Sequence, residues 1–181
     1  DLPVLIPRFV NTYGPGDTRM QRLIPRTIRS VLQGEPPTMW GGEIEREYLY
    51  IDDAVEAYLR LLSVPWVRVG RPRVFNIGTE QSISIQEMIE KILAIRGVSL
   101  PIRRVADERQ DEIPSQRVST ARARDILDWA PRVSLDEGLR TTIAWYAMNR
   151  AHTALAHAPD GSERVLSVME GASDAPSERV A

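Results

Sequence analysis

Residues 46–62 read "REYLYIDDAVEAYLRLL", where a pattern typical of a strand passes directly into a pattern typical of a helix. Aromatic and β-branched side chains favour a strand in the first part. Asp53 and Glu56 have the spacing of a capping box, which predicts a helix that continues through Leu62. Because a helix N-terminus attracts carboxylates, we interpret Asp52 and Asp53 as capping groups and not as an acid/base pair.

The same alternation of strand and helix continues on both sides of this stretch. Strand patterns lie at 3–10, 46–51, 73–78 and 100–105, and helix patterns lie at 23–33, 53–62, 84–97, 120–128 and 134–150. Alternating strands and helices predict an α/β fold. An apolar strand follows Asp1 directly, and strands of this kind are normally covered on both faces. We therefore expect the beginning of the protein to be missing.

Composition limits the classes of function. The 181 residues are 43% hydrophobic with a formal charge of -2, which fits one domain at 1–150 and a small, polar, flexible tail at 151–181. The near-neutral charge argues against nucleic acid as a partner. No apolar run reaches the roughly 20 residues that span a bilayer, so no membrane partner is expected. The absence of cysteine and the late position of both histidines argue against a metal site. The absence of cysteine also fits a cytoplasmic protein.

Motifs that would carry catalysis are not found in the sequence. It contains no G-x-G-x-x-G after a strand, no G-x-x-x-x-G-K, no G-x-S-x-G and no H-E-x-x-H. Lys91, the only lysine, has Glu87 four residues before it, so there is no Tyr-x-x-x-Lys pair. The "GPG" at 14–16 lacks a following helix at the spacing of a phosphate cradle, and we interpret it as a turn. No catalytic residue is assigned.

Polar side chains do occur near the ends of predicted strands, where a strand begins or finishes. They are Asn11, Arg46, Asn76 and, in a charged loop, Arg109. Ligands of open α/β sheets bind at such ends, and the fork of an arginine suits a diphosphate. Trp40 could offer a face on which a base stacks. Each signal has a plainer alternative: Arg46 as a surface ion pair with a nearby glutamate, Trp40 as a core residue, and the asparagines as partners of loop backbone.

The order of the segments points to a family. They are "RFVNTYGPGD" (8–17), "RLIPRTIRSVLQGEPP" (22–37), "REYLYIDDAVEAYLRLL" (46–62), "VFNIGTEQSISIQEMIEKI" (74–92), "RQDE" (109–112) and "LDWAPRVSLDEGLRTTIAWY" (127–146). Together they resemble the C-terminal half of the NAD-dependent nucleotide-sugar epimerase/dehydratase family, the extended short-chain dehydrogenases, over about residues 3–148. Residues 13–17 and 22–35 are most similar to the 4,6-dehydratase branch, and to CDP-glucose 4,6-dehydratase-like proteins in particular.

The resemblance implies roles for individual residues. It implies contacts to the nucleotide sugar from Asn11, Leu23, Thr38, Trp40, Arg46, Asn76, Arg109 and Glu112, and a place near the nicotinamide for Phe9. By this resemblance Arg46 is similar to the arginine that binds the diphosphate, and the extended segment with Thr38 and Trp40 matches the one that flanks the base. The sequence departs from the family at Glu47, where aspartate is usual, and at Asp111, where glycine is usual.

The resemblance also implies a fold and a reaction. The expected fold is the C-terminal part of a Rossmann-type protein with the small substrate-binding α/β subdomain, without the N-terminal half that binds most of the NAD. The parent reaction is oxidation of the sugar at C4 to a 4-keto intermediate, followed by water elimination or epimerisation. This part would bind a nucleotide-diphosphate sugar, would be inactive alone and would belong to a homodimeric parent. The alternative is a non-catalytic nucleotide-sugar-binding module.

Overall fold

The computed structural model describes residues 4–40, 43–106 and 113–149. The strands are β1 (Ile6–Phe9), β2 (Asn11–Tyr13), β3 (Thr38–Trp40), β4 (Glu45–Tyr50), β5 (Val74–Ile77), β6 (Ser82–Ser84) and β7 (Arg103–Val105). The helices are α1 (Leu23–Gln33), α2 (Ile51–Ser63), α3 (Trp66–Val69), α4 (Ile85–Arg96), α5 (Ala121–Leu127) and α6 (Leu135–Met148). The predicted α/β class is confirmed. None of the helices in these ranges is long and apolar enough to cross a membrane.

The strands pair in three small groups. β1 lies parallel to β5, β3 lies parallel to β7, and β4 lies between the parallel β2 and the antiparallel β6. The strand predicted at 3–10 is divided, because the Val10 amide donates to Ile77 of β5 while the chain pairs with β4 from Asn11 onward. The chain therefore changes sheets at Val10, and this change brings Asn11 beside β4.

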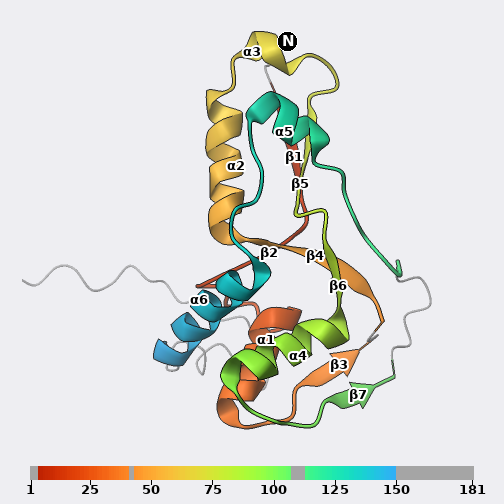
Figure 1. Cartoon of the computed structure of the whole chain (residues 1–181), viewed down its shortest axis with the longest axis vertical. Helices are drawn as coiled ribbons and strands as arrows, with labels where there is room; N and C mark the ends of the chain where they lie inside the picture. The colour runs from red at the N-terminus through yellow and green to blue at the C-terminus, as the bar shows by residue number, and fades with distance from the viewer. Residues whose placement is uncertain (1–3, 41–42, 107–112, 150–181) are drawn as a thin grey trace, which may run out of the picture.

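Two clusters of buried apolar side chains form the core. Figure 1 shows α2 and α5 beside β1 and β5 in one part of the molecule, and α1, α4 and α6 with β3 and β7 in the other. β4 belongs to both parts, since Leu49 is buried in the cluster under α2 and Tyr50 in the cluster between α1, α4 and α6. Successive side chains of a strand point to opposite faces, which is why neighbouring residues of β4 serve different clusters.

Local signals in the sequence set the helix ends correctly in most places. α1 ends at Gly34, which has a φ of 75° that glycine adopts without strain. α4 begins with the predicted capping box of Ser84 and Glu87 and ends at Gly97. The hydroxyl of Ser134 accepts from the Glu137 amide at the start of α6. These helices are specified by residues within a few positions of their ends.

The predicted cap of α2 is wrong. The helix begins at Ile51 with Tyr50 at its N-cap, which makes no side-chain capping bond. The carboxylate of Asp53 is instead buried and accepts from the backbone amides of Arg132 and Val133 at 3.0 and 3.1 Å. Because the helix starts before both aspartates, Asp53 lies inside its first turn, where its side chain fastens the chain that leads into α6.

Candidate functional site

A cavity of about 550 Å³ lies between β2, β4, the start of α1 and the end of β3. Four side chains expected to bind the substrate line it, each from a different segment: Asn11, Leu23, Trp40 and Arg46. The pairing of β2 with β4 also lets the side-chain amide of Asn11 donate to the carbonyl of Glu47 at 3.3 Å. The fold thus brings together residues that are dispersed along the chain.

Arg46 lies in the wall that β4 contributes to this cavity. Its guanidinium donates to the carbonyls of Glu45 and Ile113 at 2.8 and 2.7 Å. The carboxylate of Glu45 accepts from the hydroxyls of Ser82 and Ser115, both at 2.9 Å. These contacts tie Arg46 to backbone and hold its charge at the edge of the cavity.

Trp40 lines the cavity together with Arg26, which the sequence analysis did not assign to the site. The Arg26 guanidinium lies 4.0 Å from the centre of the Trp40 ring, a distance at which a cation is attracted to the ring face. Burial, together with the nearby charge of Arg29, lowers the pKa of Arg26. Arginine remains charged near neutral pH even so. One face of Trp40 is therefore covered by a flat cation.

The loop before α1 forms a further part of the wall. The Arg22 guanidinium bonds the Asp17 carboxylate and the carbonyl of Thr12, both at 2.9 Å. The hydroxyl of Tyr146 in α6 donates to the carbonyl of Asp17. The "GPG" ahead of this aspartate forms a turn, as predicted. The loop is fixed from both sides, by α1 and by α6.

The tyrosines of the cavity, Tyr13 and Tyr48, hold their phenolic protons more tightly than free tyrosine. Burial raises the pKa of Tyr48 to about 12, and the charges of Arg46 and Arg22 only partly oppose this. The pKa of Tyr13 is raised as well, first by burial and then by Tyr50 and nearby carboxylates. Both phenols are therefore protonated at neutral pH. Three arginines and one aspartate line the cavity, which gives it a net positive charge suited to an anion.

Other expected site residues do not line the cavity. Thr38 precedes Trp40 on β3 by two residues but is not part of the wall. Asn76 donates its side-chain amide to the carbonyl of Ser119 at 3.3 Å. The ring of Phe9 lies 4.9 Å from that of Tyr58 and packs against the cluster under α2. Their assigned roles stay predictions.

Two expected site residues, Arg109 and Glu112, lie outside the described residues. The structure therefore gives no position for the phosphate and ribose contacts that were assigned to them.

Sequence reasoning missed Arg22, Arg26 and Tyr48, which also line the cavity. Signals for all three were present. Arg22 and Arg26 are four residues apart at the start of a helix, so they share the face that carries Leu23 to the cavity. Tyr48 is two residues from Arg46 on a strand and therefore points to the same side.

A second hollow of about 820 Å³ lies between β6, α4 and the start of α6. Its charged groups already serve the fold: Lys91 bonds Asp136 at 2.7 Å, and the Glu87 carboxylate caps α4. Across the described residues, no group of three or more acidic or histidine side chains could hold a metal ion. The positively charged cavity beside β4 is therefore the better candidate site.

Sequence comparison shows similarity to a family model and to curated proteins. Residues 1–78 match the model described as the NAD dependent epimerase/dehydratase family. The UDP-N-acetyl-alpha-D-glucosaminuronate decarboxylase of Bacillus cytotoxicus is 33% identical over 153 residues, which cover 80% of this chain and 46% of that protein. The chain spans about half the length of the curated relatives it matches.

Solved structures share the fold. The UDP-glucose 4-epimerase of Thermotoga maritima, solved with UDP-glucose, matches 80% of this chain and 46% of its own, with a TM-score of 0.72 and 28% identity. The dTDP-glucose 4,6-dehydratase of Bacillus anthracis, solved with NAD, matches 86% of this chain and 48% of its own, with a TM-score of 0.76 and 25% identity.

Proposed function

Because the chain belongs to the NAD-dependent epimerase/dehydratase family and has the fold of part of a Rossmann-type extended short-chain dehydrogenase, we propose that it is the substrate-binding part of a nucleotide-sugar epimerase or 4,6-dehydratase. The cavity beside β4 is the proposed site of the nucleotide diphosphate. One observation carries this proposal: Asn11, Leu23, Trp40 and Arg46, dispersed in the sequence, line the same cavity.

The diphosphate is assigned to the arginine side of the cavity. A guanidinium keeps its charge and donates in a fork that matches phosphate oxygens, and Arg46 presents this group from a rigid strand. Asn11 pairs with Tyr48 from the neighbouring strand β2 and lines the same cavity as Arg46, where its side chain adds a neutral amide. Hydrogen bonds to charged groups stabilise a complex by about 1.5 to 3 kcal/mol each.

The base is assigned to the stack of Arg26 and Trp40. Planar cations and aromatic rings both offer surfaces on which a base stacks, and such stacking contributes about 1 to 3 kcal/mol. The similar proteins named above act on UDP-linked and dTDP-linked sugars. These nucleotides both carry pyrimidines, so we propose a pyrimidine nucleoside diphosphate sugar as the substrate class.

NAD is the cofactor that the family name gives, and its chemistry is hydride transfer to and from C4 of the sugar. Phe9, the side chain expected near the nicotinamide, packs against Tyr58 and does not line the cavity. The role of Phe9 near the nicotinamide stays a prediction, and we derive no step through NAD. Their proposed contribution is to bind and orient the sugar nucleotide, which lowers the entropic cost of reaction.

The binding of nucleotides by the 181-residue chain tests the proposal. Isothermal titration calorimetry with UDP-glucose, dTDP-glucose and CDP-glucose is expected to give saturable binding, and glucose 1-phosphate is expected to bind far more weakly because it lacks the base and one phosphate. With no Tyr-x-x-x-Lys pair in the sequence, we expect binding without formation of a 4-keto sugar. Failure of all three nucleotide sugars to bind would contradict the proposal.

A second experiment, an assay for the 4-keto sugar, separates the two candidate roles. Addition of NAD is expected to leave the chain without turnover in either case. A non-catalytic module should bind the nucleotide sugar equally well with and without an NAD-binding α/β partner of the same family, and should form no product. Part of an enzyme should yield a 4-keto sugar when that partner is supplied. The homodimeric state and the cytoplasmic location of the parent stay predictions.

A further inference from the structure

A buried carboxylate lies behind the cavity wall, on the face of β4 opposite Arg46. Glu47 is 1% exposed, whereas its neighbours Arg46 and Tyr48 line the cavity. Side chains alternate along a strand, so Glu47 points away from the cavity and into the structure behind it. Burial of a charged carboxylate is costly unless hydrogen bonds compensate it. The partners of Glu47 therefore show what the side chain holds.

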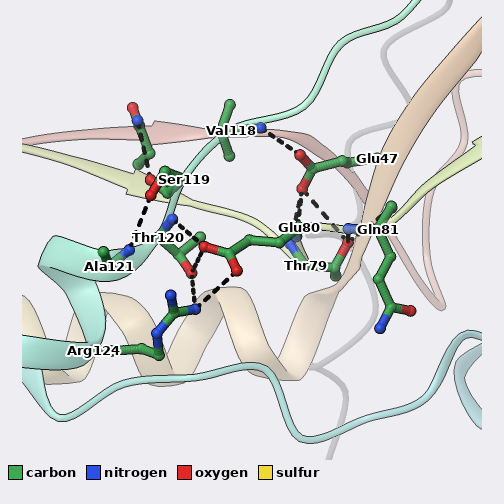
Figure 2. A network of polar contacts seen from close by, with 10 residues as sticks. Glu47, Thr79, Glu80, Gln81, Val118, Ser119, Thr120, Ala121 and Arg124 are labelled. Carbon is green, nitrogen blue, oxygen red and sulfur yellow. Dashed lines mark hydrogen bonds and ion pairs between the residues drawn. The ribbon is translucent and has the colours of Figure 1, made fainter.

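Figure 2 shows the Glu47 carboxylate facing the backbone of two separate segments. One oxygen, Oε2, accepts from the amides of Thr79 and Glu80 at 2.9 Å, and Oε1 accepts from the amide of Val118 at 2.5 Å. Bonds from backbone N–H groups to an ionised carboxylate are stronger than bonds between neutral groups. A Cβ at Gly78 would lie 2.6 Å from Oε2, so the turn approaches closely only because this residue is glycine.

One of these two segments, residues 113–118, also hydrogen-bonds to Arg46. The backbone of Glu45 makes hydrogen bonds of 2.8 and 3.3 Å to the segment 113–118, which runs along β4. At one end of this segment the carbonyl of Ile113 accepts the Arg46 guanidinium at 2.7 Å. At the other end Val118 donates to Glu47. The segment therefore supplies one of the backbone carbonyls that hold the Arg46 guanidinium, and Glu45 supplies another.

Glu47 also touches the second polar group of the cavity through its backbone. Its carbonyl accepts the side-chain amide of Asn11 at 3.3 Å. We propose that Glu47 is a positioning residue for the nucleotide diphosphate: its buried carboxylate fastens the segment 113–118 and the turn at 79–80 to β4, and so holds Arg46 at the cavity. This inference rests on the proposed function, because it presupposes a nucleotide diphosphate in that cavity.

A double-mutant cycle tests the inference. The affinity of UDP-glucose or dTDP-glucose, whichever binds the unaltered chain more tightly, is measured by calorimetry for Glu47→Gln, Arg46→Ala and the double variant. Glu47→Gln is expected to weaken binding by about tenfold, because an amide cannot accept all three N–H groups. In the Arg46→Ala background the same change is expected to alter affinity by less than about twofold, since its effect is transmitted through the arginine.

Glu80→Gln is the matched control. Glu80 accepts from the amide and hydroxyl of Thr120 and pairs with Arg124, so it joins the same turn at 79–80 to the start of α5 without contacting the cavity residues (Figure 2). This variant is expected to lower thermal stability and to leave nucleotide affinity unchanged. An equal loss of affinity in Glu80→Gln and Glu47→Gln would show that general destabilisation is responsible, and would overturn the inference.

Glu47→Asp covers the case in which Glu47→Gln does not fold. It keeps the charge but is one methylene shorter, and it is expected to bind with an affinity between those of the unaltered chain and Arg46→Ala. Wild-type affinity in either Glu47 variant overturns the inference alone. If the unaltered chain binds no nucleotide sugar, the proposed function is overturned and the inference loses its premise. This outcome differs from wild-type affinity in a Glu47 variant, which overturns only the role of Glu47.

Discussion

The guanidinium of Arg26 lies 4.0 Å from the centre of the Trp40 ring in the wall of the cavity beside β4. The same kind of pair occurs elsewhere, where Arg73 lies 4.3 Å from the centre of the Trp66 ring, away from the cavity. Among the described residues, an arginine–tryptophan pair of this kind thus occurs in the proposed base site and another occurs outside it. They allow a direct comparison of stacking with and without a ligand.

Substitution of Trp40 tests the base site. Trp40→Ala is expected to weaken the binding of UDP-glucose by about 1 to 3 kcal/mol, because a stacked base contributes about that amount. Affinity is measured by calorimetry at constant salt. Trp66→Ala removes an equivalent pair and is expected to leave affinity unchanged. Equal affinities in the two variants would place the base away from Trp40.

Substitution of Arg46 tests the diphosphate contact. Arg46→Ala is expected to weaken nucleotide-sugar binding by about 1.5 to 3 kcal/mol, or roughly 10- to 150-fold, the range for a hydrogen bond to a charged group. Arg46→Lys keeps the charge but lacks the planar fork, so it should fall between wild type and alanine. Calorimetry with UDP-glucose measures both variants.

Arg60 provides the control for this experiment. It pairs with Glu56 at 2.7 Å on the surface of α2, and its removal takes away one arginine without touching the cavity. Arg60→Ala is expected to bind UDP-glucose as the unaltered chain does. A similar loss of affinity in Arg60→Ala and Arg46→Ala would mean that overall charge, and not a local contact, attracts the nucleotide.

The bonds of Asp53 are expected to contribute to stability and not to binding. Asp53→Asn replaces an acceptor of two backbone amides by a group with one acceptor oxygen and an NH₂ that faces a donor. We expect a loss of about 1 to 3 kcal/mol in the free energy of unfolding, measured by urea titration. Asp52→Asn, at an exposed position of the same helix turn, is the control and should change stability far less.

The ion pair of Glu80 predicts a dependence of stability on pH. The hydrogen bond from Arg124, followed by those from the amide and hydroxyl of Thr120, lowers the pKa of Glu80 to about 2 from its ordinary 4.5. A lowered pKa means that the ionised form stabilises the fold. This contribution is fully present above pH 4.5 and disappears as the pH falls from 4.5 toward 2.

Thermal unfolding of the unaltered chain and of Glu80→Gln measures this effect. At pH 7 the unaltered chain is expected to have the higher midpoint. The difference between the two midpoints should shrink once the pH falls below 4.5, since protonated glutamate and glutamine are then alike in charge. A difference that stays constant from pH 7 to pH 3 would show that the charge of Glu80 does not contribute.

The sequence alone determined much of the local structure. The ends of α1 and α4 follow from Gly34, Gly97 and the capping box of Ser84 with Glu87, and all of these signals act within one or two turns. The alternation of strands and helices gave the α/β class. The order of the motifs gave the family, which the match over residues 1–78 supports.

Only the tertiary structure decided which side chains meet. The pairing of β2 with β4 places Asn11 opposite Tyr48, in the same cavity as Arg46, and the buried carboxylates of Asp53 and Glu47 find partners far along the chain. No local pattern predicts such partners. An aspartate near the start of a helix has the same sequence neighbours whether its carboxylate caps that helix or accepts hydrogen bonds from a distant loop. The physical reason is that burial of a charged carboxylate is unfavourable unless hydrogen bonds compensate it. The amides that can do so are those that tertiary packing places next to the carboxylate.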